Sequence, residues 1–287
     1  MSKIEDALNK VKRTGQLQVV SRNNKATSNA RDLIRRSPTD IELKNKTSSS
    51  KQIALMEEGD IYTADELDRL KIIHPDSDNL SVINRYRELR TQLIHKSNGE
   101  NFVVMVTSCE SAADTGLSTI NLASAFAFDE SKTSLAIDCN LRNPSFSRII
   151  NKDFENGITD YFEKDDVSTD DIMYSSGIKR LRVIPSGVKK ESASEYFTSM
   201  KMRSLMRELL QRYSDRYVFL NAAPILDSAD TKILVDSCDY VILDVPYGKV
   251  TTKRIKEAVN AIDANKLAGI VFSDVPPLPT RKLFKFK

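Results

Sequence analysis

The amino-acid sequence predicts an α/β domain with three layers, in which helices flank both faces of a mostly parallel sheet. Two observations predict this class. Six short apolar runs between residues 102 and 272 lack the alternation of apolar and polar positions that a strand with one wet face shows. Helix-like segments separate most of these runs, as helical crossovers between parallel strands require.

The first part of the chain, residues 1–77, is predicted to hold short helices and a flexible linker. Ser2 and Glu5 fit a capping box at the start of an amphipathic helix over residues 1–14, whose polar face is basic. This helix either packs on its own protein or docks on a membrane surface or a partner. Residues 16–59 are rich in Ser, Asn, Thr and Lys, a composition that favours a flexible linker.

Two further helices are predicted before the first strand. Thr63 and Glu66 form a second capping box, which begins a short helix that ends near residue 70. Residues 80–96 place apolar side chains at helical spacing on one face and arginines on the other. The sheet should follow directly after this helix.

The remaining elements alternate between strand and helix. Apolar runs predict strands at residues 102–107, 134–138, 181–185, 217–220, 240–245 and 267–272. Helices are predicted at residues 118–128, 192–213, 229–237 and 251–264. We therefore expect one structured domain over residues 78–275, followed by a basic tail over residues 276–287.

Composition indicates a cytoplasmic protein and gives no reason to expect a nucleic-acid partner. The 40% hydrophobic and 29% charged content is ordinary for a globular domain, and a net charge of +3 is too small to favour nucleic acid. The three cysteines lack a C-x-x-C spacing and cannot all pair within one chain, which favours a reducing compartment. No apolar run reaches the ~18–20 residues that cross a bilayer, and the N-terminus lacks the apolar segment of a signal peptide.

Residues 101–125, NFVVMVTSCESAADTGLSTINLASA, combine an apolar strand, a turn of small residues and a helix. Chains use this layout to hold a phosphate, because the helix N-terminus points free N–H groups at the anion. The phosphate-loop pattern G-x-x-x-x-G-K-[ST] is nevertheless absent, since the stretch has a single glycine, Gly116, followed by Leu117. From the residues alone, this is either a phosphate site or the remains of one.

The order of four longer stretches points to a known family. VMVTS…STINLA, LAIDCNLRNPSF, LRVIPSG and YVFLNAAPILDSAD…VDSCDYVILDV follow one another in the chain, and in this order they resemble the bacterial tyrosine kinases (BY-kinases) of exopolysaccharide and capsule export. That family is related to the ParA/MinD P-loop ATPases. The resemblance covers roughly residues 78–275 and implies a P-loop-like domain, in which active members use ATP and Mg²⁺ to phosphorylate tyrosine.

The first family motif, the phosphate loop, lacks its lysine in either alignment. Counting back from the N-L-A of the following helix puts Thr115 at the position of the phosphate-binding lysine and Gly116 at that of the magnesium-binding hydroxyl. Shifting the gap lets Ser118 and Thr119 supply the hydroxyl, but it leaves Leu117 in place of lysine. The resemblance therefore implies a loop without its cation.

The second and third family motifs each lose a carboxylate. The D-x-D-x-R motif is present as Asp138, Asn140 and Arg142, and the aspartate of the third motif is Asn221. An asparagine lacks the charge that holds Mg²⁺, and phosphoryl transfer depends on positioning and charge neutralisation. Asp138 has a second interpretation, as a strand-end carboxylate that caps the turn before Pro144.

Together these substitutions predict a degenerate kinase-like protein that holds no metal and needs no cofactor. Its degenerate catalytic positions are Thr115, Asn140 and Asn221. If ATP still binds, the resemblance implies that the contacts come from Gly116, Ser118, Thr119, Asp138 and Arg142.

The helix at residues 80–96 carries the candidate partner-binding residues. The family's oligomerisation signature E-x-x-R-x-x-R appears here as Asn84, Arg87 and Arg90, so both arginines are present and the glutamate is absent. Ring formation as a homo-oligomer is therefore in question, whereas docking onto a partner stays open. The plainer alternative for the arginines is a solvated helix face.

Three functions are compatible with these patterns. The favoured one is a non-catalytic regulator or scaffold of exopolysaccharide biosynthesis and export, acting through a membrane polysaccharide co-polymerase (the chain-length determinant protein) and so placed at the inner membrane. The second is an active tyrosine autokinase or ATPase with an atypical P-loop, which would use ATP and Mg²⁺. The third is a ParA/MinD-like positioning protein, and the absence of a loop lysine pair argues against it.

Overall fold

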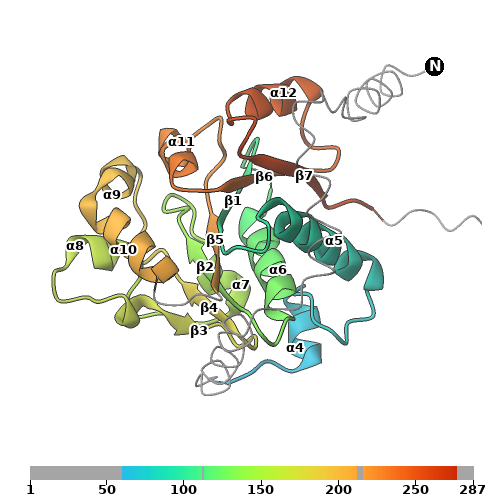
Figure 1. Ribbon diagram of the computed structural model, residues 1–287, viewed down its shortest axis with the longest axis horizontal. Helices are drawn as coiled ribbons and strands as arrows, with labels where there is room; N and C mark the ends of the chain where they lie inside the picture. Colours follow the sequence, from blue (N-terminus) through green and yellow to red (C-terminus); the bar gives the residue numbers. More distant parts are fainter. Residues whose placement is uncertain (1–59, 112, 212–215, 277–287) are drawn as a thin grey trace, which may run out of the picture. The chain divides into compact units, whose positions relative to one another are not determined.

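A seven-stranded sheet forms the centre of the computed structural model, which describes residues 60–111, 113–211 and 216–276 (Figure 1). Its order is β3-β4-β2-β5-β1-β6-β7, and each neighbouring pair is parallel except β3 with β4. This confirms the predicted three-layer fold. The strands are β1 Val103–Ser108, β2 Thr133–Asp138, β3 Tyr174–Ser175, β4 Leu181–Ile184, β5 Arg216–Asn221, β6 Tyr240–Pro246 and β7 Leu267–Ser273.

The two faces of the sheet bury separate apolar cores. Along β1, Val103 and Met105 point into one core, and Val104 and Val106 point into the other. All six residues of β1 are buried. A central strand with a core on each face has no solvent-exposed face. This explains why the sequence shows apolar runs in which apolar and polar residues do not alternate.

Helices cover both faces of the sheet (Figure 1). The core that contains Val104 also contains residues of four helices, α4 Ala64–Arg69, α5 Leu80–Lys96, α6 Thr115–Ala127 and α7 Phe146–Ile150. The core that contains Val103 includes a short 3-10 helix at Asp170–Ile172 and residues of five helices, which are α8 Ile158–Glu163, α9 Ser194–Thr198, α10 Met200–Gln211, α11 Ala229–Asp236 and α12 Thr252–Asn260.

The predicted helix at residues 192–213 is wrong as a single unit. Ser199, between α9 and α10, has an extended backbone with φ −68° and ψ 159°, and its hydroxyl accepts the Met202 N–H at 3.1 Å. This hydrogen bond satisfies one of the free N–H groups at the start of α10. Three further elements, α7, α8 and β3, were not predicted, because at five, six and two residues they are too short for a periodic pattern.

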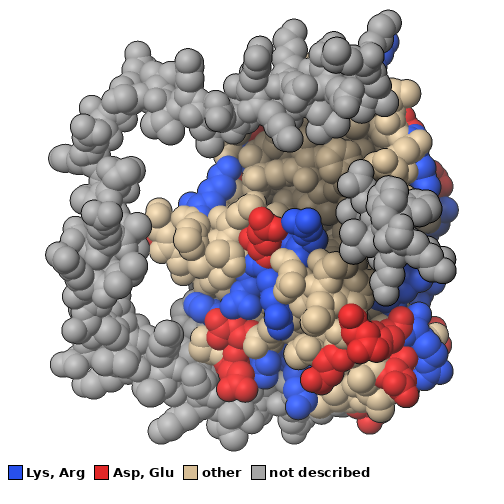
Figure 2. Space-filling view, turned by 90° about the vertical axis from the view of Figure 1, so that its right-hand side faces the viewer, with Lys and Arg blue, Asp and Glu red and all other residues tan. Residues whose placement is uncertain are grey.

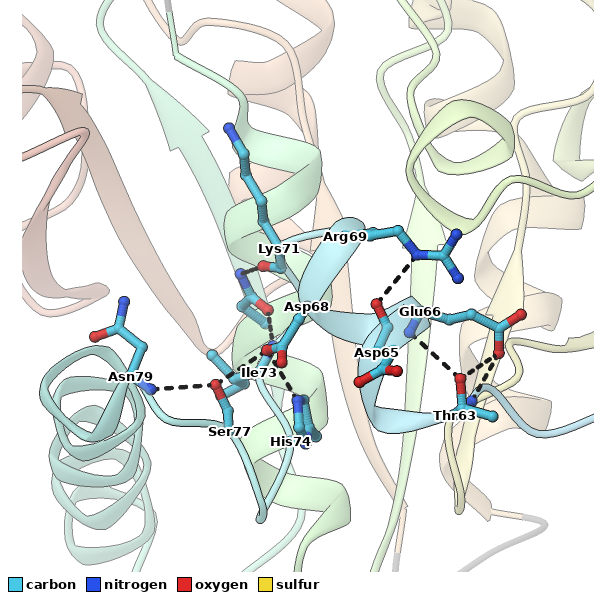
Figure 3. A network of polar contacts seen from close by, with 11 residues as sticks. Thr63, Asp65, Glu66, Asp68, Arg69, Lys71, Ile73, His74, Ser77 and Asn79 are labelled. Atoms are coloured by element: carbon cyan, nitrogen blue, oxygen red, sulfur yellow. Dashed lines mark hydrogen bonds and ion pairs between the residues drawn. The ribbon is translucent and has the colours of Figure 1, made fainter.

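Residues 62–77 pack against the helix that follows β1 (Figure 3). The predicted capping box is present at the start of α4 Ala64–Arg69. After α4, Asn121 of α6 accepts the Ile73 N–H at 2.8 Å and donates to the Lys71 carbonyl at 3.1 Å. These two bonds hold the turn, in which Lys71 has a φ of 59°. His74 is buried and lies 3.0 Å from an oxygen of Asp68.

Several predicted segments lie outside the described residues. These are the helix at residues 1–14, the linker at residues 16–59, and all but the first residue of the tail at 276–287. In the part of the chain that the structure describes, no helix combines the length and the apolar character that spanning a membrane requires.

Candidate functional site

A small cleft opens at the carboxyl ends of β1, β2 and β5, where the parallel sheet predicts a ligand site. Its volume is about 70 Å³, well below the roughly 300–1,000 Å³ of typical small-molecule pockets. One cation, Arg142, is among the residues that line it, and no lysine is. The lining residues are Ser108, Ser111, Ala113, Thr115, Asn140, Arg142, Asn143, Ala223, Pro224, Asp227 and Ser228.

Asp114 caps the helix that would face a phosphate. Its Oδ1 accepts the Leu117 N–H at 3.2 Å, and its Oδ2 lies 3.5 Å from the guanidinium of Arg148. An N-terminal carboxylate of this kind satisfies a free N–H and is favoured by the helix dipole. The chain's own anion therefore lies where a phosphate loop would leave donors free for its ligand.

The hydroxyl groups of α6 bond within the protein. Thr115 donates to the Ala222 carbonyl at 3.5 Å, and Thr119 donates to the Thr115 carbonyl at 2.6 Å. Ser118 donates to the Asp244 carboxylate at the end of β6. Of these three side chains, only that of Thr115 lines the cleft.

Gly116 is required by a close contact with the segment that follows β2. A Cβ atom at this position would lie 2.0 Å from Oγ of Ser145 and 2.9 Å from Cδ1 of Ile149. No real Cβ sits that close to a heavy atom, so a serine or threonine at 116 would have to displace Ser145 or α7. The position that the resemblance gives to a magnesium-binding hydroxyl has no room for one.

Asp138 is fully buried at the end of β2 and accepts four hydrogen bonds. Its Oδ2 accepts the N–H groups of Ser145 and Phe146 at 2.8 and 3.1 Å. Its Oδ1 accepts the Asn140 N–H at 3.2 Å and the side-chain amide of Asn221 at 2.7 Å. Burial raises the pKa of Asp138, and these four donors oppose that rise.

Asn221 faces Asp138 with an amide where the family motif has a second carboxylate. The amide nitrogen donates to Asp138 and also to Oγ of Ser145 at 3.3 Å. Two carboxylates at this separation would repel each other unless a cation or a proton lay between them. The side-chain amide of Asn221 instead donates an N–H to Asp138, so the two side chains attract each other without a bridging cation.

Asn140 and Arg142 reach the cleft from the loop after β2. Asn140 uses its Oδ1 to accept the Asn143 N–H at 3.2 Å, which closes the turn. The guanidinium of Arg142 donates to the Glu191 carbonyl at 3.1 and 3.3 Å and is about half exposed. Of the predicted nucleotide contacts, Arg142 is the one that keeps a charge available to solvent.

Comparison with known proteins agrees with this geometry. A family model, AAA_31, described as an AAA domain, matches residues 111–268, which is more than half of the chain. The chain belongs to the AAA_31 family. The matched residues of this AAA_31 domain run from the loop after β1 into β7 and therefore include most of the cleft.

Two curated relatives of the AAA_31 domain are tyrosine-protein kinases by name. The putative tyrosine-protein kinase EpsB of Ralstonia solanacearum is 26% identical over 207 residues, which cover 71% of this chain and 26% of EpsB. The tyrosine-protein kinase CpsD of Streptococcus pneumoniae is 27% identical over 177 residues, which cover 60% of this chain and 75% of CpsD. The chain thus spans about a quarter of EpsB.

A solved structure shares the fold. The chimerical protein CapA2B2 superposes with a TM-score of 0.65 at 22% identity, covering 80% of this chain and 99% of that one. The two curated relatives confirm the predicted resemblance of the AAA_31 domain to bacterial tyrosine kinases.

One group at the cleft of the AAA_31 domain was missed from the sequence. Arg254 of α12 lies 3.0 Å from Glu110 in the loop after β1 and 3.1 Å from Asp227 in the loop after β5. It joins two loops that border the cleft, and both acidic partners raise the pKa of its guanidinium. The three residues are far apart in sequence and share no motif, so no sequence signal could have found them.

The two candidate partner-binding arginines differ in their surroundings. Arg90 donates to the Ala125 carbonyl at 3.1 Å and lies 3.3 Å from an oxygen of Asp129, so it joins α5 to the end of α6. Arg87 is exposed and its guanidinium lies 5.7 Å from the ring centre of Phe128. Arg87 is the better placed of the two for contact with another protein.

Proposed function

We propose that this chain is a non-catalytic, kinase-like regulator or scaffold of exopolysaccharide biosynthesis and export, which controls chain length through a membrane polysaccharide co-polymerase. The observation that supports the proposal is the state of the cleft, where the side chains at the phosphate and metal positions hydrogen-bond within the protein. The resemblance to the exopolysaccharide tyrosine kinases supplies the pathway and the class of partner. The chain would lie at the inner membrane through that partner.

The loss of catalysis follows from charge. Phosphoryl transfer needs a cation on the phosphates and carboxylates that hold Mg²⁺. At the lysine position the chain has Thr115, and at two metal-site positions it has Asn140 and Asn221. Asp114 adds a negative charge at the helix N-terminus, where it would repel a phosphate.

Nucleotide binding and phosphorylation test the first half of the proposal. Calorimetric titration of the purified full chain with Mg²⁺-ATP should give no saturable binding, and mass spectrometry should find no phosphotyrosine after incubation with ATP. The control is Arg142→Ala, which removes the exposed cation of the cleft and no buried contact. Saturable ATP binding that Arg142→Ala abolishes, together with phosphotyrosine, would instead establish the alternative function, an autokinase with an atypical P-loop.

Co-purification with the membrane partner tests the second half. The tagged chain should retain a polysaccharide co-polymerase from solubilised membranes, and Arg87→Glu should weaken this retention because it reverses the charge of an exposed residue on α5. The matched control is Arg85→Glu, on the same helix and also exposed, whose charge pairs with Glu88 at 3.3 Å. Equal retention by wild type and both variants would show that Arg87 does not contact the partner.

A further inference from the structure

The two edges of the sheet differ in how far they are covered. At one edge, β3 has only two residues and runs antiparallel to β4, and the turn that follows it accepts the Tyr62 N–H through the Gly177 carbonyl at 2.8 Å. At the other edge, β7 has seven residues, none of them charged and none a proline. Within the described residues no strand pairs with the outer side of β7. A long apolar edge of this kind is a template for another strand, because its outward backbone groups are open to pairing.

Ile270 and Phe272 of β7 present both apolar side chains and backbone groups at this edge. The register pairs them with the buried Leu243 and Val245 of β6, so the four side chains share one face of the sheet. Ile270 is 39% exposed and Phe272 is 55% exposed. The Ser273 carbonyl accepts a backbone N–H from the loop after β6 at 2.8 Å and therefore points toward β6. Because backbone direction alternates along a strand, the N–H and carbonyl groups of Phe272 and Ile270 point outward.

The surface around this edge adds further apolar side chains. Tyr247 and Val275 are 55% and 52% exposed, and the Tyr247 N–H donates to the Ser273 carbonyl, which places Tyr247 beside the end of β7. Figure 2 views the side on which β7 and α5 lie, and it shows a broad uncharged area next to a mixed area of acidic and basic residues. Exposed apolar patches of this kind mark contact sites.

The two ends of β7 carry opposite charges. At the start of the strand, the ammonium of Lys96 on α5 lies 3.4 Å from the Leu267 carbonyl. Directly after the strand comes Asp274, which lies 2.8 Å from the ammonium of Lys249 and keeps 60% of its side chain exposed. Two copies of β7 that run in opposite directions would bring each Lys96 toward the Asp274 of the other copy, whereas parallel copies would bring like charges together. The edge is therefore complementary to itself in the antiparallel direction.

We propose that two copies of this chain pair through β7, with the two strands antiparallel and the two-fold axis passing beside Ile270. Ile270 is the central residue of Leu267–Ser273, so this register is the one that overlaps the whole strand. It places Ile270 opposite Ile270 of the second copy, where the outward N–H and carbonyl groups of the two residues can form two hydrogen bonds. The two-residue strand β3 is too short to serve as the other side of such a contact, so the interface is isologous and closes at a dimer. The pairing continues the apolar row of Ile270 and Phe272 from one sheet into the next.

Disulfide trapping of the full chain tests the position of the two-fold axis. Residues opposite each other in a hydrogen-bonded antiparallel pair have Cα atoms about 5.5 Å apart, a separation that a disulfide can bridge. Ile270→Cys should therefore form a covalent dimer under mild oxidation with diamide, seen on a non-reducing gel, while wild type should not, because its three cysteines are buried. The matched control is Phe272→Cys on the same edge, whose two copies would lie about four residues, or ~14 Å, apart along the strands and should stay unlinked. Equal cross-linking of the two variants, or none in Ile270→Cys, would overturn the proposal.

Sedimentation equilibrium of the full chain tests the dimer itself. The mass of wild type should approach twice that of the monomer as the protein concentration rises. Ile270→Lys should raise the dimer Kd by about tenfold, because it places two like charges opposite each other at the axis. The matched control is Ile61→Lys, because Ile61 is 44% exposed and lies outside the sheet, and it should leave the Kd unchanged. Hydrogen exchange of the β1 amides reports whether each variant stays folded.

Two outcomes of the sedimentation experiment would overturn the proposal. An Ile270→Lys variant that dimerises as tightly as wild type would place the interface elsewhere on the molecule. A wild type that stays monomeric at every concentration would assign the edge to a strand of another protein or to another segment of the same chain.

Discussion

Two buried carboxylates at strand ends, Asp138 on β2 and Asp244 on β6, have very different surroundings. Both side chains are fully buried. Asp138 accepts hydrogen bonds from four donors. Asp244 accepts one from the Ser118 hydroxyl, and its Oδ1 is buried with no donor at hydrogen-bond distance among the described residues. Asp138 is therefore the better satisfied of the two, as expected of a carboxylate that holds its own turn together.

The difference lies in how many donors the protein places around each carboxylate. At Asp138 the donors come from the turn that follows the strand and from Asn221, and they oppose the rise in pKa that burial causes, although the pKa still lies above its usual value. At Asp244 burial raises the pKa, and the nearby hydroxyls of Ser118 and Ser273 oppose only part of that rise. We therefore expect substitutions of the two acids to act in opposite directions on stability.

The largest effect is expected for Asp138→Ala. This change leaves three backbone N–H groups buried without an acceptor and removes the shorter of the two hydrogen bonds of the Asn221 amide, and each buried donor left unpaired carries a desolvation cost. The free energy of unfolding should fall by about 4 kcal/mol, measured by urea denaturation. Asp138→Asn should also destabilise, since its amide cannot accept from all four donors. A loss no larger than that caused by changing an exposed acid such as Asp165 would remove the contrast with Asp244.

A smaller loss is expected for Asn221→Asp, which places two carboxylates in contact. Like charges at this distance raise the pKa of one group, so the folded variant binds a proton that the unfolded variant releases near pH ~4. The lost stability should therefore be about 2 kcal/mol at pH ~8 and should diminish as the pH falls. Melting temperatures across this range measure it.

The effect of magnesium ions on the stability of Asn221→Asp gives a further test. They should not restore the stability of Asn221→Asp, because Asn140 supplies no charge and Gly116 supplies no hydroxyl. A melting temperature that rises with Mg²⁺ in this variant and not in wild type would show that the cleft still holds a metal geometry, contrary to the proposed function.

The smallest effect, and the only gain, is expected for Asp244→Asn. The folded-state pKa of Asp244 lies above its usual value of 3.8, so wild type loses stability as the pH rises from about 4 through the raised pKa. The asparagine has no such cost and should stabilise the protein by about 1 kcal/mol at pH ~8. The gain should vanish near pH ~4, which urea denaturation at the two pH values would check. Destabilisation at the higher pH would mean that the charge of Asp244 is needed.

Much of the fold could be predicted because the central strands are buried on both faces. The runs around Val104, Leu135 and Phe219 are buried throughout, and a doubly covered parallel sheet accounts for them. The sequence did not predict the short helices α7 and α8, because they depend on contacts with residues that are far away in sequence. At α8, for example, the Ile158 N–H bonds to the Pro185 carbonyl at 2.9 Å.

The resemblance placed candidate residues at the strand ends, and Thr115, Asn140 and Arg142 line the cleft there, but it could not give their contacts. The resemblance identified Thr115, Asn140 and Asn221 as altered positions. It could not show that Asn221 donates to Asp138, or that Ser118 turns away from the cleft toward Asp244. Those facts depend on side-chain orientation, which follows from packing between elements rather than from motif spacing.

The contact between Gly116 and Ser145 limits which side chains position 116 can hold. A serine or threonine at 116 would meet Oγ and Cβ of Ser145 and Cδ1 of Ile149, so these side chains would have to move before a hydroxyl could fit there. The nearest atoms all belong to side chains, and two of the three belong to Ser145. Positions 116 and 145 therefore form one packing unit, in which the side chain that fits at 116 depends on the side chain at 145.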